Sequence, residues 1–320
     1  MKNKILNLLL IAGVVTFTAC NEDETPEPTT NNTVETNTII DVTTENGFTI
    51  LGQALTRVDL VDVLEGEGPF TVFAPTDSAF QALLTELNLT SLDEVSDDDL
   101  KQILLNHVVS GKVMSTDLTA GYVNTLSDGP EETKLSLLVD LTDGVMLNNR
   151  SKVTQADVAA DNGVIHVIDR VITRPSVVDA ALANPNFSIL VAALTRDDLT
   201  TDFVATLSAE GPYTVFAPTN KAFQDLLAGN DDWDELADIP VAVLEAVLKY
   251  HVVAGTNVQS TEITDGMMPE TFEGSTVTIN NTNGVVLTDQ NGGTSTVQIA
   301  DVQTSNGVIH AISAVILPKL

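Results

Sequence analysis

The sequence is poor in cysteine, in basic residues and in aromatic residues. Cys20 is the only cysteine among 320 residues, which excludes a disulfide within the chain. Only 14 lysines and arginines stand against 45 aspartates and glutamates, so the formal net charge is −31. That charge repels the phosphate backbone of nucleic acids and argues against nucleic-acid binding. We interpret the acidity as a source of solubility rather than as a partner-binding surface.

The motifs of the common enzyme classes are also missing. The chain contains no G-x-S-x-G, no H-E-x-x-H, no G-x-x-x-x-G-K-[ST] and no C-x-x-C. The turn at Gly66 to Gly68 is followed by Pro69, which removes an N–H that a phosphate would need. Carboxylates are too numerous for a catalytic pair to be singled out. We therefore predict a protein that is not an enzyme and has no cofactor, with a carbohydrate-active hydrolase as a remote alternative.

The chain begins with the pattern of an export signal over residues 1–19. Basic residues precede an apolar run from Ile5 to Val15, which is too short to remain as a membrane span. Small residues, Thr18 and Ala19, then precede Cys20. This layout resembles a bacterial lipoprotein signal. The resemblance implies lipid attachment at Cys20, and the lipid anchor is the only membrane contact that we expect.

An acidic segment over residues 20–37 follows the signal. It is rich in Thr, Asn, Glu and Pro, and Val34 is its only aliphatic residue, which predicts a flexible tether. Its start, Asn21 to Glu24, resembles the acidic export tag of surface lipoproteins of the Bacteroidota. We expect an exported protein that is lipid-anchored to the outer membrane, with the cell surface as the expected side.

The rest of the chain is a duplication. GPFTVFAPTDSAF at Gly68 to Phe80 returns as GPYTVFAPTNKAF at Gly211 to Phe223. NGVIHVIDRVI at Asn162 to Ile172 returns as NGVIHAISAVI at Asn306 to Ile316. With 43% hydrophobic residues, each copy can bury a core of its own. The sequence therefore predicts two similar domains in tandem, over residues 38–174 and 175–320.

In each copy the pattern predicts helices first and strands later. Phe80, Leu83 and Leu84 share one face of a helix, with Thr76 or Asp77 as its N-cap. A second helix opens at Ser96 with three acids, and its apolar face continues through His107 and Val108. The predicted strands with hairpin turns span residues 135–141, 145–147, 153–158 and 164–172 in the first copy and 276–279, 285–287, 297–300 and 308–316 in the second. We predict the α+β class.

Three motifs occur in the same order in both copies: TVFAPT, the HVV segments that begin at His107 and His251, and NGVIH. Together they resemble a fasciclin domain, twice over. The resemblance implies, for each domain, a wedge-shaped β-sandwich of about seven strands with a helical bundle on one side. It also implies a secreted or surface-anchored protein used in cell adhesion and matrix contacts. In animal members a Tyr-His motif is associated with integrin binding. Tyr250 and His251 match it, so we take this pair as a candidate contact motif without carrying over the ligand.

All four histidines fall at repeated positions, His107 and His251 on the predicted helix and His166 and His310 on the closing strand. A functional interpretation pairs a helix histidine with a strand histidine as metal ligands or a proton relay. No further ligand recurs with them, so we predict structural, neutral imidazoles that hydrogen-bond to the backbone, and no metal. Calcium at the acidic segment Asp97 to Asp99 is a weaker interpretation than helix capping.

The predicted function is a non-catalytic, surface-anchored adhesion module that binds a protein or polysaccharide of the cell surface or matrix. The alternative is an envelope protein that binds a small ligand or polysaccharide. An adhesion module should expose a contact patch, whereas a ligand-binding protein should have a pocket of about a few hundred Å³. A hydrolase should bring carboxylates together in a cleft.

Overall fold

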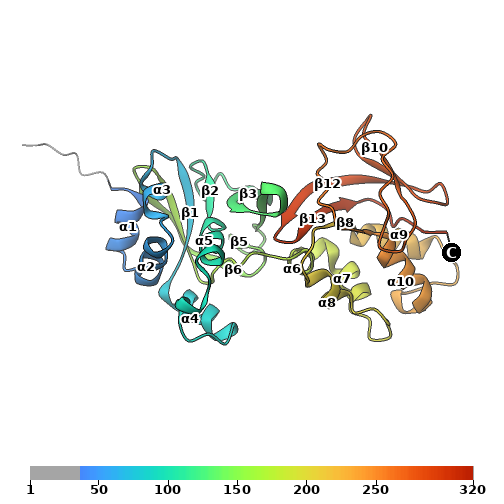
Figure 1. Cartoon of the computed structure of the whole chain (residues 1–320), viewed down its shortest axis with the longest axis horizontal. Coiled ribbons are helices and arrows are strands. Elements are labelled where there is room, and N and C mark those ends of the chain that lie inside the picture. The colour runs from blue at the N-terminus through green and yellow to red at the C-terminus, as the bar shows by residue number, and fades with distance from the viewer. Residues whose placement is uncertain (1–36, 320) are drawn as a thin grey trace, which may run out of the picture. The chain divides into compact units, whose positions relative to one another are not determined.

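The computed structural model describes residues 37–319, which are drawn in colour in Figure 1 and belong to one unit of the chain. The predicted export signal, Cys20 and the predicted tether up to residue 36 lie outside the described residues. We call residues 37–174 the first half and residues 175–319 the second half. The described chain is of the α+β class, as predicted, with α-helices α1 to α10 and strands β1 to β13.

The first half has its helices mainly before its strands. Its helices are α1 (Ile39–Glu45), α2 (Thr49–Arg57), α3 (Val61–Glu65), α4 (Asp77–Glu86) and α5 (Asp97–Leu105), with short 3-10 turns η1 (Leu92–Glu94) and η2 (Pro130–Glu132). Its strands are β1 (Phe70–Pro75), β2 (Val108–Ser110), β3 (Gly121–Asp128), β4 (Lys134–Asp140), β5 (Met146–Leu147), β6 (Ser151–Ala160) and β7 (Gly163–Ile168).

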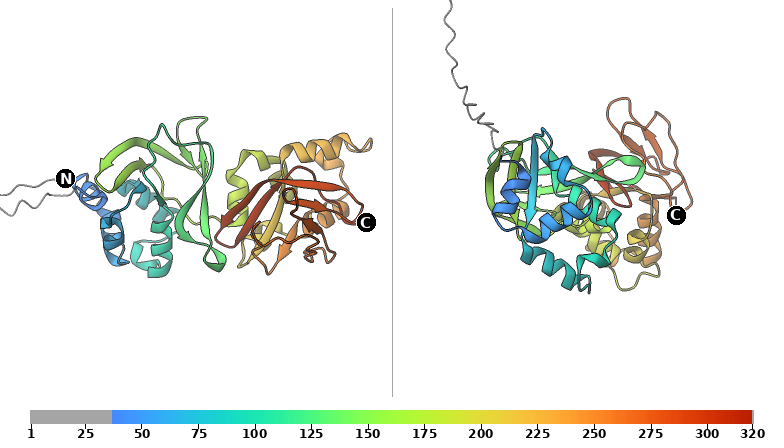
Figure 2. Two further views of the ribbon diagram at one scale, coloured as in Figure 1. Left: turned by 90° about the horizontal axis from the view of Figure 1, so that it is seen from above. Right: turned by 60° about the vertical axis from the view of Figure 1, so that its left-hand side comes forward.

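The second half repeats this order. Its helices are α6 (Val177–Ala183), α7 (Ser188–Leu194), α8 (Phe203–Ser208), α9 (Asn220–Ala228) and α10 (Val241–Tyr250), with η3 (Pro185–Phe187) and η4 (Leu236–Asp238). Its strands are β8 (Tyr213–Pro218), β9 (Val252–Ala254), β10 (Thr278–Asn280), β11 (Val286–Thr288), β12 (Thr294–Thr304) and β13 (Gly307–Ile312). In each half the helices gather on one side of the strands (Figure 2).

A parallel strand pair lies at the same place in both halves. In the first half the strands pair in chain order, and β7 returns parallel to β1, so the strands form a ring. In the second half the order is β10-β11-β12-β13-β8-β9, and β13 is parallel to β8. The first strand of each half therefore lies directly beside its last.

An asparagine fastens the start of each half to this parallel pair. The Asn162 side chain accepts a hydrogen bond from the Ile39 N–H (3.0 Å) and donates to the carbonyls of Leu64 (2.6 Å) and Gly66 (2.9 Å). Asn306 makes the same three bonds in the second half, with Val177, Leu207 and Ala209. Both asparagines are largely buried, so their polar atoms depend on these partners.

The strand-to-helix turn after β1 forms as its residue types predict. Thr76 is the N-cap of α4, and its hydroxyl accepts the Ala79 N–H at 3.2 Å. Phe80 on the inner face of α4 is 0% exposed, and its counterpart Phe223 is 1% exposed. Phe73 and Phe80, with Phe216 and Phe223 in the second half, are among the largest fully buried side chains of the described chain.

The second predicted helix ends earlier than its apolar face suggested. Helix α5 ends at Leu105, and Val108 already belongs to β2, where it pairs with Val72 of β1. The prediction that His107 and Val108 continue the helix was wrong, because an apolar run has the same appearance in a buried helix and in a buried strand. The His107 ring instead closes the last turn by bonding to the Ile103 carbonyl at 2.7 Å.

Among the described residues no single helix is both long and apolar enough to cross a membrane. The segments Val177–Ala183 and Pro185–Leu194, bent by 102° at their break, meet that test only as a pair.

Each half has a hydrophobic core of its own. The buried core residues of the first half lie between Ile39 and Ile172, and those of the second half lie between Val177 and Ile316. Among the described residues of the first half, Tyr122 of β3 is the one that packs against a hydrophobic cluster of the second half. The hydrophobic clusters of one half, two in number, are thus almost independent of the two in the other half.

We expect residues 38–173, expressed alone, to fold cooperatively, because their core residues and the Asn162 bonds are all retained. Thermal unfolding followed by circular dichroism should show one sharp transition. A broad, non-cooperative melt of this fragment, beside a sharp one for the whole chain, would mean that the first half needs the second to fold.

Candidate functional site

The histidine at the end of α5 is buried and fully hydrogen-bonded. His107 is 2% exposed, and its Nδ1–H donates to the Ile103 carbonyl at 2.7 Å. Its Nε2 accepts the Ile172 N–H at 2.8 Å, which fixes the neutral tautomer with the proton on Nδ1. Burial lowers the pKa of His107 to about 4, despite the opposing bond to Ile103. The ring therefore joins the end of a helix to the segment that follows the last strand.

The candidate contact motif lies at the same place in the second half. His251 bonds to the Val247 carbonyl (2.7 Å) and to the Ile316 N–H (3.1 Å), and burial lowers its pKa to about 4. Tyr250 is 0% exposed, its hydroxyl donates to the Thr276 carbonyl at 2.9 Å, and burial raises its pKa to about 12. Neither side chain of the pair is presented at the surface, and its role in contacts stays a prediction.

The histidines of the closing strands are buried between sheet and loop. His166 of β7 is 0% exposed; its Nε2–H donates to the Val113 carbonyl (3.0 Å) and its Nδ1 accepts the Asp157 N–H (3.2 Å). Its ring lies 5.5 Å from that of Phe73. His107 and His166 share no hydrogen-bond partner, since each ring is bonded to its own backbone groups.

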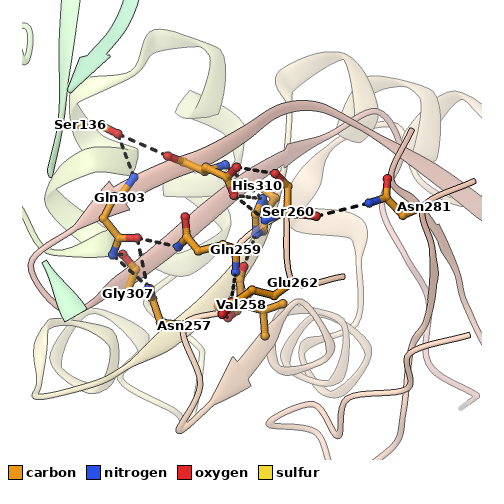
Figure 3. A network of polar contacts seen from close by, with 12 residues as sticks. Ser136, Asn257, Val258, Gln259, Ser260, Glu262, Asn281, Gln303, Gly307 and His310 are labelled. Carbon is orange, nitrogen blue, oxygen red and sulfur yellow. Dashed lines mark hydrogen bonds and ion pairs between the residues drawn. The ribbon is translucent and has the colours of Figure 1, made fainter. Parts of the chain in front are cut away.

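His310 repeats these bonds with the Val258 carbonyl (2.9 Å) and the Asp301 N–H (3.3 Å), and burial lowers its pKa. Figure 3 shows His310 among the polar residues around β12. Both ring nitrogens of all four histidines thus have a backbone partner.

A serine and an aspartate beside each strand histidine were missed by the sequence interpretation. Ser115 donates its hydroxyl to Asp157 at 2.5 Å and its N–H to the same carboxylate at 2.7 Å, and these bonds lower the pKa of Asp157. Ser260 and Asp301 form the same pair in the second half. The signal was present in the sequence, since the tripeptide Ala-Asp-Val recurs before NGVIH in both copies.

These side chains do not form a nucleophile and base. In a serine hydrolase the serine hydroxyl bonds to the histidine, and the aspartate orients that histidine from its other nitrogen. Here the Ser115 hydroxyl bonds to Asp157, and the histidine Nε2–H is taken by the Val113 carbonyl. The arrangement fixes a bulged strand, in which Asp157 has a φ of 62°, against the loop before β3.

Ser96 caps α5, and the acidic segment Asp97 to Asp99 forms the first turn of the helix. The Ser96 side chain accepts the Asp99 N–H at 3.1 Å, and all three aspartates lie in the first turn. Within residues 37–319 no group of three or more His, Cys, Asp or Glu side chains is placed to hold a metal ion.

The hollows of the first half include a groove and a pocket beside its first helices. A groove of about 640 Å³ among α1, α2 and α3 is lined mainly by apolar and threonine side chains, including Ile40, Thr43, Phe48 and Val61. A pocket of about 250 Å³ lies between the loop after α1 and strands β6 and β7, with Asn46, Val158 and Ile165 in its wall.

The halves touch through hydrogen bonds that involve the second-half network in Figure 3. The Gln303 N–H donates to the Ser136 hydroxyl at 2.9 Å, and that hydroxyl lies 3.4 Å from the Asp301 carbonyl. The Asn184 amide donates to the Tyr122 hydroxyl at 2.9 Å. Strand β4 of the first half therefore lies against β12 of the second half.

The fold and the repeated histidine sites define a protein of two homologous α+β modules in tandem. The model of the fasciclin domain matches residues 46–174 and again residues 185–318. The chain belongs to the fasciclin domain family.

Known relatives agree with this assignment. The chain is 32% identical to human periostin over 262 residues, which are 81% of this chain and 29% of periostin. It is 30% identical to the transforming growth factor-beta-induced protein ig-h3 of Sus scrofa over 257 residues, or 80% of this chain and 35% of that protein. Protein sll1483 of Synechocystis is 42% identical over 139 residues, or 43% of this chain and 74% of the relative. The chain thus spans about a third of the animal relatives.

Among solved structures, a FAS1 domain pair from the insect cell adhesion molecule Fasciclin I is similar, with a TM-score of 0.48 and 20% identity. The match covers 87% of this chain and 95% of the chain in that structure.

Proposed function

We propose that the protein is a non-catalytic adhesion module, anchored at the cell surface, that binds a protein or polysaccharide. The observation that carries the proposal is the presence of two fasciclin domains, over residues 46–174 and 185–318, in one chain. Tandem domains provide more than one contact surface, and simultaneous weak contacts gain avidity when both engage. The ring nitrogens of the repeated histidines are committed to backbone bonds, which suits a structural rather than an acid–base role.

The test is deletion of the gene in the cells that make the protein. We expect attachment to surfaces, or aggregation between cells, to fall, and re-expression of the whole chain to restore it. The purified protein should turn over no common glycan or ester. Unchanged attachment on several surfaces, or sustained turnover of any such substrate, would refute the proposal.

The proposed anchor makes a separate prediction at Cys20. Cys20→Ala should move the protein from the membrane fraction to the soluble fraction, because the thiol that would carry the lipid is removed. Fractionation and immunoblotting measure the distribution, and a Cys20→Ala protein that still partitions into detergent would show that no lipid at this position holds it.

A second candidate function is the binding of a small apolar ligand, and the groove among α1, α2 and α3 favours it. Its volume of about 640 Å³ falls within the range of about 300–1,000 Å³ typical of ligand sites. Gly52→Leu would place a large side chain into the groove from α2. Retention of a co-purified ligand by the parent and its loss in Gly52→Leu, seen by native mass spectrometry, would support this candidate over adhesion alone.

A further inference from the structure

The contact between the halves joins two unlike surfaces. The first half contributes Tyr122 of β3 and Ser136 of β4, which we call the plug surface. The second half contributes Asn184 at the end of α6, with Val302 and Gln303 of β12, which we call the socket surface. Asn184 bonds to Tyr122 and Gln303 bonds to Ser136, each at 2.9 Å. Because the chain is a duplication, each half should carry a counterpart of both surfaces.

The counterpart of the socket in the first half is uncovered. Asn46 ends α1 as Asn184 ends α6, and its amide bonds only to the Val42 carbonyl of its own helix. Val158 and Ala159 follow the bulge of β6 as Val302 and Gln303 follow the bulge of β12.

The exposure of these residues differs between the halves. Val302 and Gln303 are each 2% exposed, whereas Val158 is only partly buried and Ala159 is exposed. Asn46 and Val158 also line the pocket of about 250 Å³. The same strand edge is therefore covered in one half and open in the other.

The counterpart of the plug in the second half is uncovered as well. In the first half Gly121 pairs with Val139 and Asn124 pairs with Ser136. In the second half Met267 pairs with Ile279 and Glu270 pairs with Thr276. This register puts Met268 at the place of Tyr122 and Thr276 at the place of Ser136.

Met268 is 59% exposed, and Phe272, farther along the same segment, is 44% exposed. Two large apolar side chains of the second half are thus exposed at the place that corresponds to the contact surface of the first half. Methionine is flexible and polarizable, which suits an irregular pocket.

We propose that the plug surface of the second half docks into the uncovered socket surface of the first half of another copy of this chain. The contact between two molecules would have the same form as the contact between the two halves of one chain. Such a contact joins unlike surfaces, so it leaves a free plug at one end and a free socket at the other, and the assembly grows as an open row. If the proposed adhesion function holds, another copy of this chain would be one of the partners that the protein binds. Docking between copies can also occur without that function.

The charges around the two surfaces set the conditions for docking. Asp157 and Asp161 flank Val158 and Ala159 of the open socket in sequence, and Glu270 and Glu273 follow Met268 of the exposed plug within five residues. The chain also carries a net charge of −31. Like charges repel at low ionic strength, and salt screens them over about 10 Å at 0.1 M and about 3 Å at 1 M. Docking is therefore weak at low salt and strengthens as salt rises.

The test is sedimentation velocity of the purified mature chain over a range of protein concentrations, at 0.05 M and 0.5 M NaCl. The parent should form dimers and larger species as concentration rises, more so at high salt. Met268→Glu removes the plug and Ala159→Glu blocks the socket, and each should be monomeric at concentrations at which the parent associates. Leu87→Glu is the matched control, because Leu87 is 48% exposed at the end of α4 and belongs to neither surface. It should associate as the parent does.

Mixing the two variants tests the geometry. Met268→Glu keeps an open socket and Ala159→Glu keeps a plug, so the mixture should form one-to-one dimers that do not grow. A thermal melt like that of the parent shows that each variant is folded. A parent that stays monomeric at every salt and protein concentration, or variants that associate like the parent, would overturn the proposal. Attachment that is lost on gene deletion while the parent is monomeric would support the adhesion function and reject docking between copies.

Discussion

Gly163→Ala is expected to destabilise the first half by about 3 kcal/mol or more. Gly163 begins β7 beside β1, and a Cβ at this position would lie 2.2 Å from the Phe70 carbonyl oxygen and 2.9 Å from the Ile39 side chain. The neighbouring backbone is held by the parallel pairing of β1 with β7, so it has little room to move away. A Cβ at Gly307 would lie at the same distance of 2.2 Å from the Tyr213 carbonyl oxygen, so Gly307→Ala should destabilise the second half in the same way.

Chemical denaturation with a separate signal for each half measures the effect. The matched control is Gly52→Ala in the interior of α2, where a Cβ meets nothing within 4 Å. That substitution should stabilise the first half by about 0.5–1 kcal/mol, because alanine loses less backbone freedom than glycine on forming a helix. A Gly163→Ala protein that unfolds at the same denaturant concentration as the parent would show that β1 and β7 tolerate a wider separation.

The stability of each half is expected to fall by about 2 kcal/mol between pH 7 and pH 5, because His107 and His251 are buried as neutral rings. Their pKa values are about 4 in the folded protein, against about 6.5 for a histidine in the unfolded chain. Between these values the unfolded chain binds more protons than the folded one. The stabilisation is therefore complete above about pH 6.5 and is lost as the pH falls toward 4, at about 1.4 kcal/mol per pH unit for each histidine. The lowered pKa of His310 acts in the same direction.

Between pH 7 and pH 5 the change in stability comes from the histidines, because the carboxylates titrate mainly below this range. Hydrogen bonds from Ser115 and the backbone lower the pKa of Asp157, so its contribution to stability is present above its unfolded pKa of about 4 and is lost only below that value. His107→Gln carries no titrating ring, so the first half of this variant should lose most of its pH dependence, although it starts less stable. The second half of the same molecule serves as the control. Equal slopes in parent and variant would mean that His107 does not govern the response.

The sequence was sufficient to predict the duplication, the fold class and the fasciclin assignment, because their signals are local. Thr76 precedes its helix by one residue, and the NGVIH segment carries its turn and strand within a few positions. Strand β3 was not predicted, since GYVNTLSD alternates too weakly between apolar and polar residues to separate a strand from a loop. The helix end at Leu105 was missed for a related reason, because pairing with β1 decides whether Val108 is strand.

The contacts of the candidate site depend on residues far apart in the chain. Sequence reasoning placed His107 in the core, but its partner Ile172 is 65 residues away, and His166 finds Val113 at a separation of 53. The correspondence of Tyr122 with Met268 follows from strand register, because the segments around them have diverged. These distant hydrogen bonds and this strand correspondence can be recognised only once the three-dimensional positions of the strands are known.

The bond between Ile39 and Asn162 spans 123 residues of chain, and Phe70 of β1 pairs with Gly163 of β7, 163 − 70 = 93 residues farther along. A ribosome adds about 5–20 residues per second, so several seconds pass between the synthesis of the first helix and strand and the synthesis of the residues that they contact. Closing so long a loop is also slow in itself, because its entropy is lost before the distant contacts form. Under the proposed export this delay is an advantage, because we expect a half that lacks its last strand not to fold stably. The chain then stays unfolded, as passage through a membrane channel requires, until nearly all of that half has been made.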